Sequence, residues 1–287
     1  MTAVLKHELR GYFHSLTAYV CGAFLLVFIG IGAMRYQISY AVSNFEFVMG
    51  YSSILFAVII PILTMRVLAE ERRQKTDQLL YSLPITTTQV ILGKYLSLLI
   101  VFALPMAAVA VYPLIFRQFG DVYLPTAYGS MLAFVLVGAA LIALGVFLSS
   151  LTENQGLAAG LGAAVILFNY FSVSLAEYVS ATAMGSFLTI VLLIFAVGAL
   201  IQHLTRSEGL AAGVSIFCMV AVLAVYLIRP DSFEGLLPKV MTELSLFAHL
   251  DVFVNGVFDL GGIVYFLSVI VLFLTLAVQS MEKRRYN

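Results

Sequence analysis

The side chains that could do chemistry are concentrated in residues 66–94, which read RVLAEERRQKTDQLLYSLPITTTQVILGK. Glu71 and Lys75 are opposite charges four residues apart, a spacing that supports an exposed helix. Leucines follow at helical spacing, and Pro84 is expected to end that helix. Exposed charges beside an apolar ridge suit a docking surface for another protein. The alternative is a solvated loop that tethers two membrane spans.

The rest of the chain offers little support for catalysis or metal binding. There is no G-x-x-x-x-G-K-[ST] phosphate loop, so the chain is not expected to bind ATP in the usual way, and the energy for any active transport would come from another polypeptide. The two cysteines, Cys21 and Cys218, lie inside apolar blocks and favour neither a disulfide nor a metal site. We therefore expect no catalytic residue, cofactor or metal in this chain. The histidines are scattered without ligand-like spacing: His7, His14, His203 and His249.

The composition is that of a membrane protein. Of 287 residues, 62% are hydrophobic and only 10% are charged, whereas soluble domains carry roughly 25% charged residues. No segment outside the apolar blocks is long enough for a sizeable soluble domain. The fold class we predict is all-α, a single polytopic helical bundle. The interiors of the apolar blocks also lack the ionisable residues that mark ion or proton pathways, which disfavours an ion-driven carrier.

Eight apolar blocks are long enough to cross a bilayer, which takes about 20 residues. With the N-terminus inside, eleven lysines and arginines fall on the inner side and four on the outer side. The excess of positive charge predicts that both termini and the 66–94 segment are cytoplasmic. The blocks lie near 16–37, 47–65, 95–116, 128–151, 156–176, 181–202, 209–228 and 261–280.

Three further segments have patterns of their own. Residues 4–16 alternate apolar and charged positions at spacings of three and four, which predicts a helix in the cytoplasmic interface. Thr86 followed by Gln89 fits a capping box and predicts the start of a helix that enters the bilayer. Residues 230–260 predict one or two amphipathic helices at the outer interface, either an outer gate or a structural cap.

A ten-residue segment recurs within the chain. LTENQGLAAG at 151–160 is echoed by LTRSEGLAAG at 204–213, with seven identities. The repeat predicts two related two-span hairpins, 128–176 and 181–229, with chance similarity of small-residue membrane sequence as the alternative. Each copy carries a small-xxx-small pattern that permits close helix packing: Gly156 with Gly160, and Gly209 with Gly213.

The charged segment resembles the cytoplasmic loop of ABC type-2 transporter permeases. In that family E-x-x-x-x-T-x-x-L-L-x-[ST]-x-P recurs, followed by G-K. The turn LSSLTENQ at 148–155 is similar to the family too. The C-terminal GVFDLGGIVYFLSVIVLFLTLAVQSMEKRRYN resembles the ending of the gliding-motility (GldF-like) and copper-processing (NosY-like) branch. The motif residues in this chain are Glu71, Thr76, Leu79, Leu80, Ser82, Pro84, Gly93 and Lys94.

The resemblance implies a non-catalytic permease subunit of an exporter in the bacterial cytoplasmic membrane. Its partners would be a second permease copy or paralogue and ABC ATPase subunits, which bind ATP and Mg. It implies that residues 70–84 form a coupling helix seated on the ATPase, with an apolar contact and with orientation set by charge. The residues that carry this role over are Glu70, Glu71, Arg72, Arg73, Lys75, Thr76, Leu79, Leu80, Leu83 and Pro84.

Three matters stay open at this point: the number of spans, the cargo and the class of function. The family commonly has six spans, so the repeated hairpin would account for two additional ones. A path rich in Phe and Leu and poor in charge favours a lipidic or peptidic cargo. An ATP-independent secondary carrier and a non-transporting membrane scaffold are the competing functions.

Overall fold

The structure is a computed structural model that describes residues 1–75, 86–179, 181–192 and 233–285, with separate positions between 194 and 229. Every regular element in these residues is helical, which confirms the predicted all-α membrane bundle. The chain divides into two compact units. One comprises Met1–Tyr170 with Leu246–Asn287, and the other comprises Phe171–Ser245.

Among the described residues, six helical segments are long and apolar enough to cross a membrane. They correspond to the first five and the last of the predicted blocks. The other two predicted spans, 181–202 and 209–228, are described only in part, and the described residues there include one shorter apolar helix, Ala183–Leu192. The count of eight therefore stays a prediction. The six segments are Leu16–Ser39, Glu46–Gln74, Thr87–Phe116, Leu124–Leu151, Gln155–Tyr178 and Leu260–Lys283.

Three of these segments are interrupted along their length. The first is α2 (Leu16–Ala33) followed by a π-helical turn, η1 (Met34–Ser39). The second consists of α3 (Glu46–Ser52), the 3₁₀ turn η2 (Ser53–Leu55), α4 (Phe56–Thr64) and α5 (Ala69–Gln74). The third is α7 (Thr87–Val109), which precedes the short α8 (Tyr112–Phe116).

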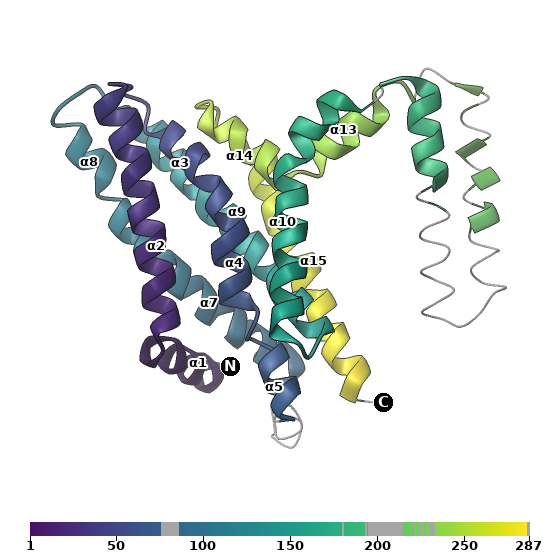
Figure 1. The fold of residues 1–287 in the computed structure, drawn as a ribbon, viewed down its shortest axis with the longest axis horizontal. Coiled ribbons are helices and arrows are strands. Elements are labelled where there is room, and N and C mark those ends of the chain that lie inside the picture. The colour runs from purple at the N-terminus through teal and green to yellow at the C-terminus, as the bar shows by residue number, and fades with distance from the viewer. Residues whose placement is uncertain are drawn as a thin grey trace. The chain divides into compact units, whose positions relative to one another are not determined.

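The remaining helices of the larger unit are continuous. They are α1 (Thr2–His14), α9 (Leu124–Leu151), α10 (Gln155–Tyr178), whose last turns belong to the second unit, α14 (Leu246–Val254) and α15 (Leu260–Arg285). Figure 1 shows α1 running across one end of the larger unit, beside the lower end of α2. The helix expected in residues 4–16 is therefore present. Residues 230–260, where one or two helices were expected, contain α13 (Leu236–Glu243) and α14.

Helix α9 is the centre of the larger unit. It packs against α4, α7, α14 and α15, and small residues on it let its neighbours come close. A Cβ at Gly138 would lie 2.5 Å from the Phe102 ring, and one at Gly145 would overlap Thr64 of α4. Beside Gly138, the rings of Phe56 and Phe134 lie 4.4 Å apart between centroids. Glycine is thus required at two places, one on the approach to α7 and one on the approach to α4.

The second unit has an aromatic contact and a backbone link of its own. The Phe187 ring stacks on that of Tyr226 at 4.5 Å, and Phe233 packs edge-on against Tyr226 at 5.5 Å. The Gly235 N–H donates to the Ala181 carbonyl at 2.8 Å. These interactions join the segment after α10 to the start of α13.

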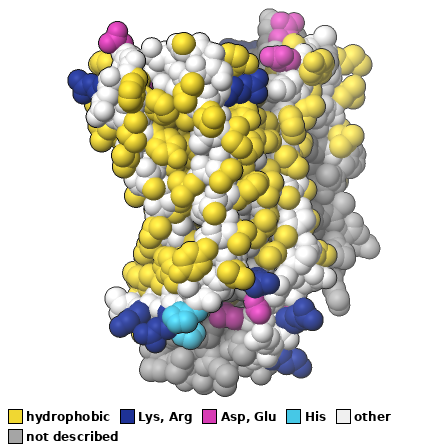
Figure 2. Space-filling model, turned by 60° about the vertical axis from the view of Figure 1, so that its left-hand side comes forward, with side chains coloured by type: hydrophobic (Ala, Val, Ile, Leu, Met, Phe, Trp, Pro, Cys, Tyr) yellow, Lys and Arg dark blue, Asp and Glu magenta, His cyan; other side chains and the backbone are white. Residues whose placement is uncertain are grey.

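One face of the molecule has the layered surface of a membrane-spanning protein. Figure 2 shows a broad band of hydrophobic side chains with lysine, arginine and acidic side chains gathered at both ends. Such a band matches the hydrocarbon layer, with the charged groups in the headgroup regions.

Candidate functional site

The break between α4 and α5 is stabilised by a hydroxyl from another helix. Ser149 on α9 is fully buried, and its Oγ accepts hydrogen bonds from the Leu68 N–H at 3.2 Å and the Ala69 N–H at 3.1 Å. The same hydroxyl donates to the Met65 carbonyl at 3.3 Å. The first N–H groups of a helix have no partner within the helix, so Ser149 acts as a cap for α5 supplied by α9.

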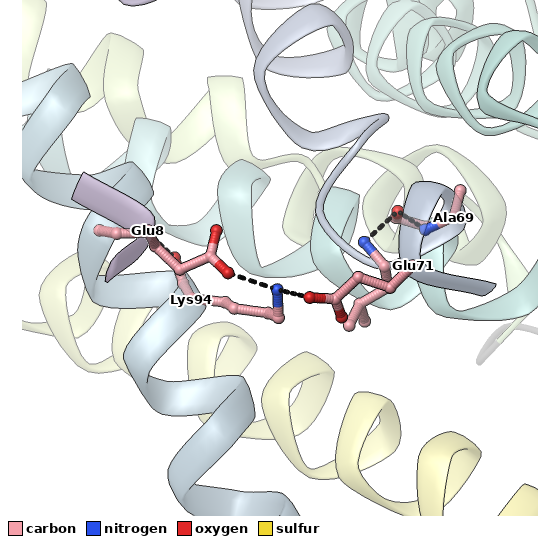
Figure 3. A network of polar contacts seen from close by, with 7 residues as sticks. Glu8, Ala69, Glu71 and Lys94 are labelled. Carbon is pink, nitrogen blue, oxygen red and sulfur yellow. Dashed lines mark hydrogen bonds and ion pairs between the residues drawn. The ribbon is translucent and has the colours of Figure 1, made fainter. Parts of the chain in front are cut away.

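A buried lysine joins α5 to two further helices. Lys94, on the second turn of α7, has a side chain that is only 2% exposed. Its Nζ lies 2.7 Å from Glu8 Oε1 on α1 and 2.7 Å from Glu71 Oε1 on α5. Figure 3 shows the ammonium between the two carboxylates. A buried charge is tolerated only when it is paired, so these three residues, which we call the Lys94 clamp, fix three helices to one point.

Gly93 explains how α1 comes close enough for the clamp to form. A Cβ at Gly93 would lie 3.0 Å from Val4 Cγ1 and 3.1 Å from Val4 Cβ, so any larger residue would push α1 away by a few tenths of an ångström. Val4 and Glu8 are four residues apart and share a face of α1. The Gly93–Lys94 pair therefore combines a close helix approach with the charge that secures it.

Tyr12 extends this contact by one more turn of α1. Its side chain packs against the core, and burial, with the carboxylates of Glu8 and Glu71 nearby, raises the pKa of the Tyr12 phenol above its ordinary value. The phenol therefore stays neutral beside the two carboxylates.

Helix α5 ends earlier than expected for one continuous helix over the charged residues. The regular helix ends at Gln74, because Lys75 adopts the left-handed conformation with φ 57° and its N–H bonds back to the Arg72 carbonyl. Glu71 and Lys75 therefore do not lie along one uninterrupted exposed helix, and Glu71 turns inward to Lys94. On the same helix the Gln74 side chain donates to Glu70 at 3.2 Å.

Several predicted site residues can be assigned a place and others cannot. Arg73 and Lys75 are exposed at the end of α5. The capping box is present at the start of α7, where Thr86 Oγ1 accepts from the Gln89 N–H at 3.3 Å. Residues 76–85 lie outside the described part of the chain. They include five of the predicted coupling residues: Thr76, Leu79, Leu80, Leu83 and Pro84.

The predicted glycine pairs have no helix partner where they are described. A Cβ at Gly156 would meet only Asn154 Oδ1, at 3.3 Å, and one at Gly160 would meet no atom within 4 Å. Gly209 and Gly213 lie outside the described residues. Asn154 itself caps α10, where its Oδ1 accepts from the Gly156 N–H at 2.9 Å.

Sequence reasoning missed two residues of the site: Glu8, which pairs with Lys94, and Ser149, which caps α5. A signal for the first was present, because Lys94 stands where the apolar run begins and a lysine there requires a carboxylate. Ser149 gave no comparable signal, since serine is common in apolar helices. Within the described ranges, no three His, Cys, Asp or Glu side chains are grouped to hold a metal ion.

Residues 34–228, more than half of the chain, match the model of the family described as ABC-2 family transporter protein. The chain belongs to this family. A search of curated proteins found no significant match. The protein is thus a multi-pass membrane protein and a permease subunit of an ABC transporter, a class in which a partner subunit is generally the ATPase. The match includes Glu71, Lys94 and Ser149, whereas Glu8 precedes it.

Proposed function

We propose that this chain couples ATP hydrolysis by a separate ATPase subunit to export of a cargo across a bacterial cytoplasmic membrane. The observation that carries the proposal is the Lys94 clamp. It joins the segment expected to touch the ATPase to the N-terminal helix and to the third span at distances of 2.7 Å.

The mechanism follows from what is attached to α5. ATP binding closes the ATPase subunits and displaces the docked segment, residues 70–84, whose first residues belong to α5. Ser149 ties the start of α5 to α9, and Glu71 ties its first turn to α7 and α1. Breaking a buried ion pair costs about 3–5 kcal/mol, so displacement of the segment moves these helices together rather than separating them. ATP then shifts the permease between two conformations in proportion to its differential affinity for them.

The rest of the assignment follows the family resemblance. We place α1, the 66–94 segment and both termini on the cytoplasmic side, in agreement with the bias of lysine and arginine. ATP and Mg are bound by the partner, and the permease works with a second copy or a paralogue. The C-terminal sequence supports the GldF-like or NosY-like branch.

The cargo class is inferred from what the spans lack. Charged side chains in the described spans are confined to their ends, apart from the paired Lys94. This favours a lipidic or peptidic cargo over an ion, and it makes an ATP-independent carrier the weaker alternative.

Affinity co-purification from native membranes tests the proposal. An ATPase subunit should accompany the wild-type chain and disappear with Leu79→Asp/Leu83→Asp, which puts charge into the predicted apolar contact. Leu244→Asp is the matched control, because Leu244 is exposed and lies in the segment predicted to be outside. Folded protein that never recovers an ATPase in several mild detergents would point to a carrier or scaffold instead.

A further inference from the structure

An apolar groove opens at the end of the larger unit that is opposite α1 and α5. Its volume is about 400 Å³, which lies within the range of roughly 300–1,000 Å³ typical of sites for small molecules. One wall is formed by α2 and η1 and the other by α8. The residues that carry the argument are Gly30, Ile31, Met34, Tyr112, Ile115 and Phe116.

Both walls of the groove end in an arginine. Arg35 follows Met34 on the first wall, and Arg117 follows Phe116 on the second. Both arginines are exposed, and neither forms an ion pair with any acidic group that the structure describes. Two cations for which the described residues supply no acidic partner thus directly follow lining residues of the groove.

Aromatic residues hold the first of these cations at that level. The Arg35 guanidinium lies 5.6 Å from the Tyr40 ring centroid and 5.8 Å from that of Tyr51, and it donates to the Tyr40 hydroxyl at 3.3 Å. Tyrosine rings gather at the membrane interface because one end is apolar and the other polar. The guanidinium is therefore held at headgroup depth, with several of its donors left for a ligand.

We propose that this groove binds an anionic phospholipid, with one acyl chain between α2 and α8 and the phosphate on Arg35 and Arg117. The apolar lining matches an acyl chain and excludes a polar solute. A phosphate accepts charge-assisted hydrogen bonds from arginine, whose planar fork fits its oxygens. The site lies at the opposite end of the unit from the Lys94 clamp, and the proposal is independent of how the ATPase docks.

Native mass spectrometry of the full-length chain with added dioleoyl phosphatidylglycerol tests the two halves of the site separately. Gly30→Leu should abolish retention, since a Cβ at Gly30 faces the groove with only the Tyr112 hydroxyl at 4.0 Å. Gly160→Leu, which adds the same side chain where no atom lies within 4 Å, should leave binding unchanged. Arg35→Gln and Arg117→Gln should each weaken binding about fivefold. Neither arginine variant touches the core, so both keep the test valid if Gly30→Leu does not fold.

Two further experiments distinguish a bound phospholipid from a soluble phosphate and from a second copy of the chain. Glycerol 3-phosphate, which has the phosphate without the acyl chains, should not compete. Phosphatidylglycerol with a photoreactive acyl chain should label peptides of α2 and α8. Equal binding by wild type, Gly30→Leu and both arginine variants, or labels confined to other helices, would overturn the proposal. So would a change of oligomeric state in Gly30→Leu without a change in lipid binding, which would make the groove an interface between copies of the chain.

Discussion

Lys94 and Glu8 are 86 positions apart in the chain, and their charged atoms lie 2.7 Å apart. Glu71 meets the same ammonium at the same distance. One cation thus holds two carboxylates that would otherwise repel each other, and three helices converge on it. The clamp carries a net charge of −1, since one positive and two negative groups contribute, and its carboxylates are 19% and 24% exposed.

Lys94→Met should destabilise the protein by about 3 kcal/mol, because it leaves two neighbouring carboxylates without their cation. The chain has no tryptophan, so we would measure loss of the monodisperse peak after heating, by size-exclusion chromatography. The neutral triple variant Glu8→Gln/Glu71→Gln/Lys94→Met should recover part of the loss. If the triple variant is no more stable than Lys94→Met, the unpaired carboxylates are not the cause of the lost stability.

Gly93→Ala should destabilise the contact between α1 and α7 by about 1–3 kcal/mol, because the added methyl group meets Val4 at 3.0–3.1 Å. Adding Val4→Ala removes one of those atoms and should restore part of the stability. Gly160→Ala is the control, since open space there lets the helix gain up to about 1 kcal/mol from the better helix former. Equal behaviour of the two glycine variants in thermal melts would argue against a close approach at Gly93.

Ser149→Ala should cost about 1–3 kcal/mol, because the buried N–H groups of Leu68 and Ala69 lose their acceptor. Hydrogen exchange should rise locally in residues 66–74. Ser150→Ala is the matched control, since the Ser150 hydroxyl is also buried but donates only within its own helix, to the Phe147 carbonyl at 2.6 Å. Unchanged exchange in Ser149→Ala would mean that another group caps α5.

Tyr12 should make stability fall at alkaline pH. Its pKa is raised in the folded protein, so the unfolded chain loses the phenol proton first, at about pH 10. The contribution of the neutral Tyr12 phenol to the free energy of unfolding is complete below about pH 10 and is lost as the pH rises through the pKa of the folded protein. Tyr12→Phe should reduce the difference in thermal stability between pH 9 and pH 11, whereas Tyr123→Phe, at an exposed tyrosine, should not. If both variants lose stability to the same extent as wild type, Tyr12 is not the group responsible.

The helices could be predicted from sequence more readily than their contacts. Long apolar runs and the Thr86 cap are local signals; six of the eight predicted spans are helices long and apolar enough to cross a membrane in the described residues, and the cap is present. The end of α5 at Lys75 was missed because nothing in the local sequence opposes a helix there. The clamp itself depends on Glu8, whose pairing is set by the approach of α1 at Gly93 and not by any nearby pattern.

The long sequence separation within the clamp also sets an order of events during biosynthesis. Glu8 emerges from the ribosome 86 residues before Lys94, an interval on the order of 10 s at ordinary elongation rates. Until then α1 has no buried cation to bind, and the first two spans enter the bilayer with the N-terminal helix unsecured. The N-terminal helix is therefore fixed to α7 only after the third span has begun to insert, so its attachment reports that the first three spans have come together.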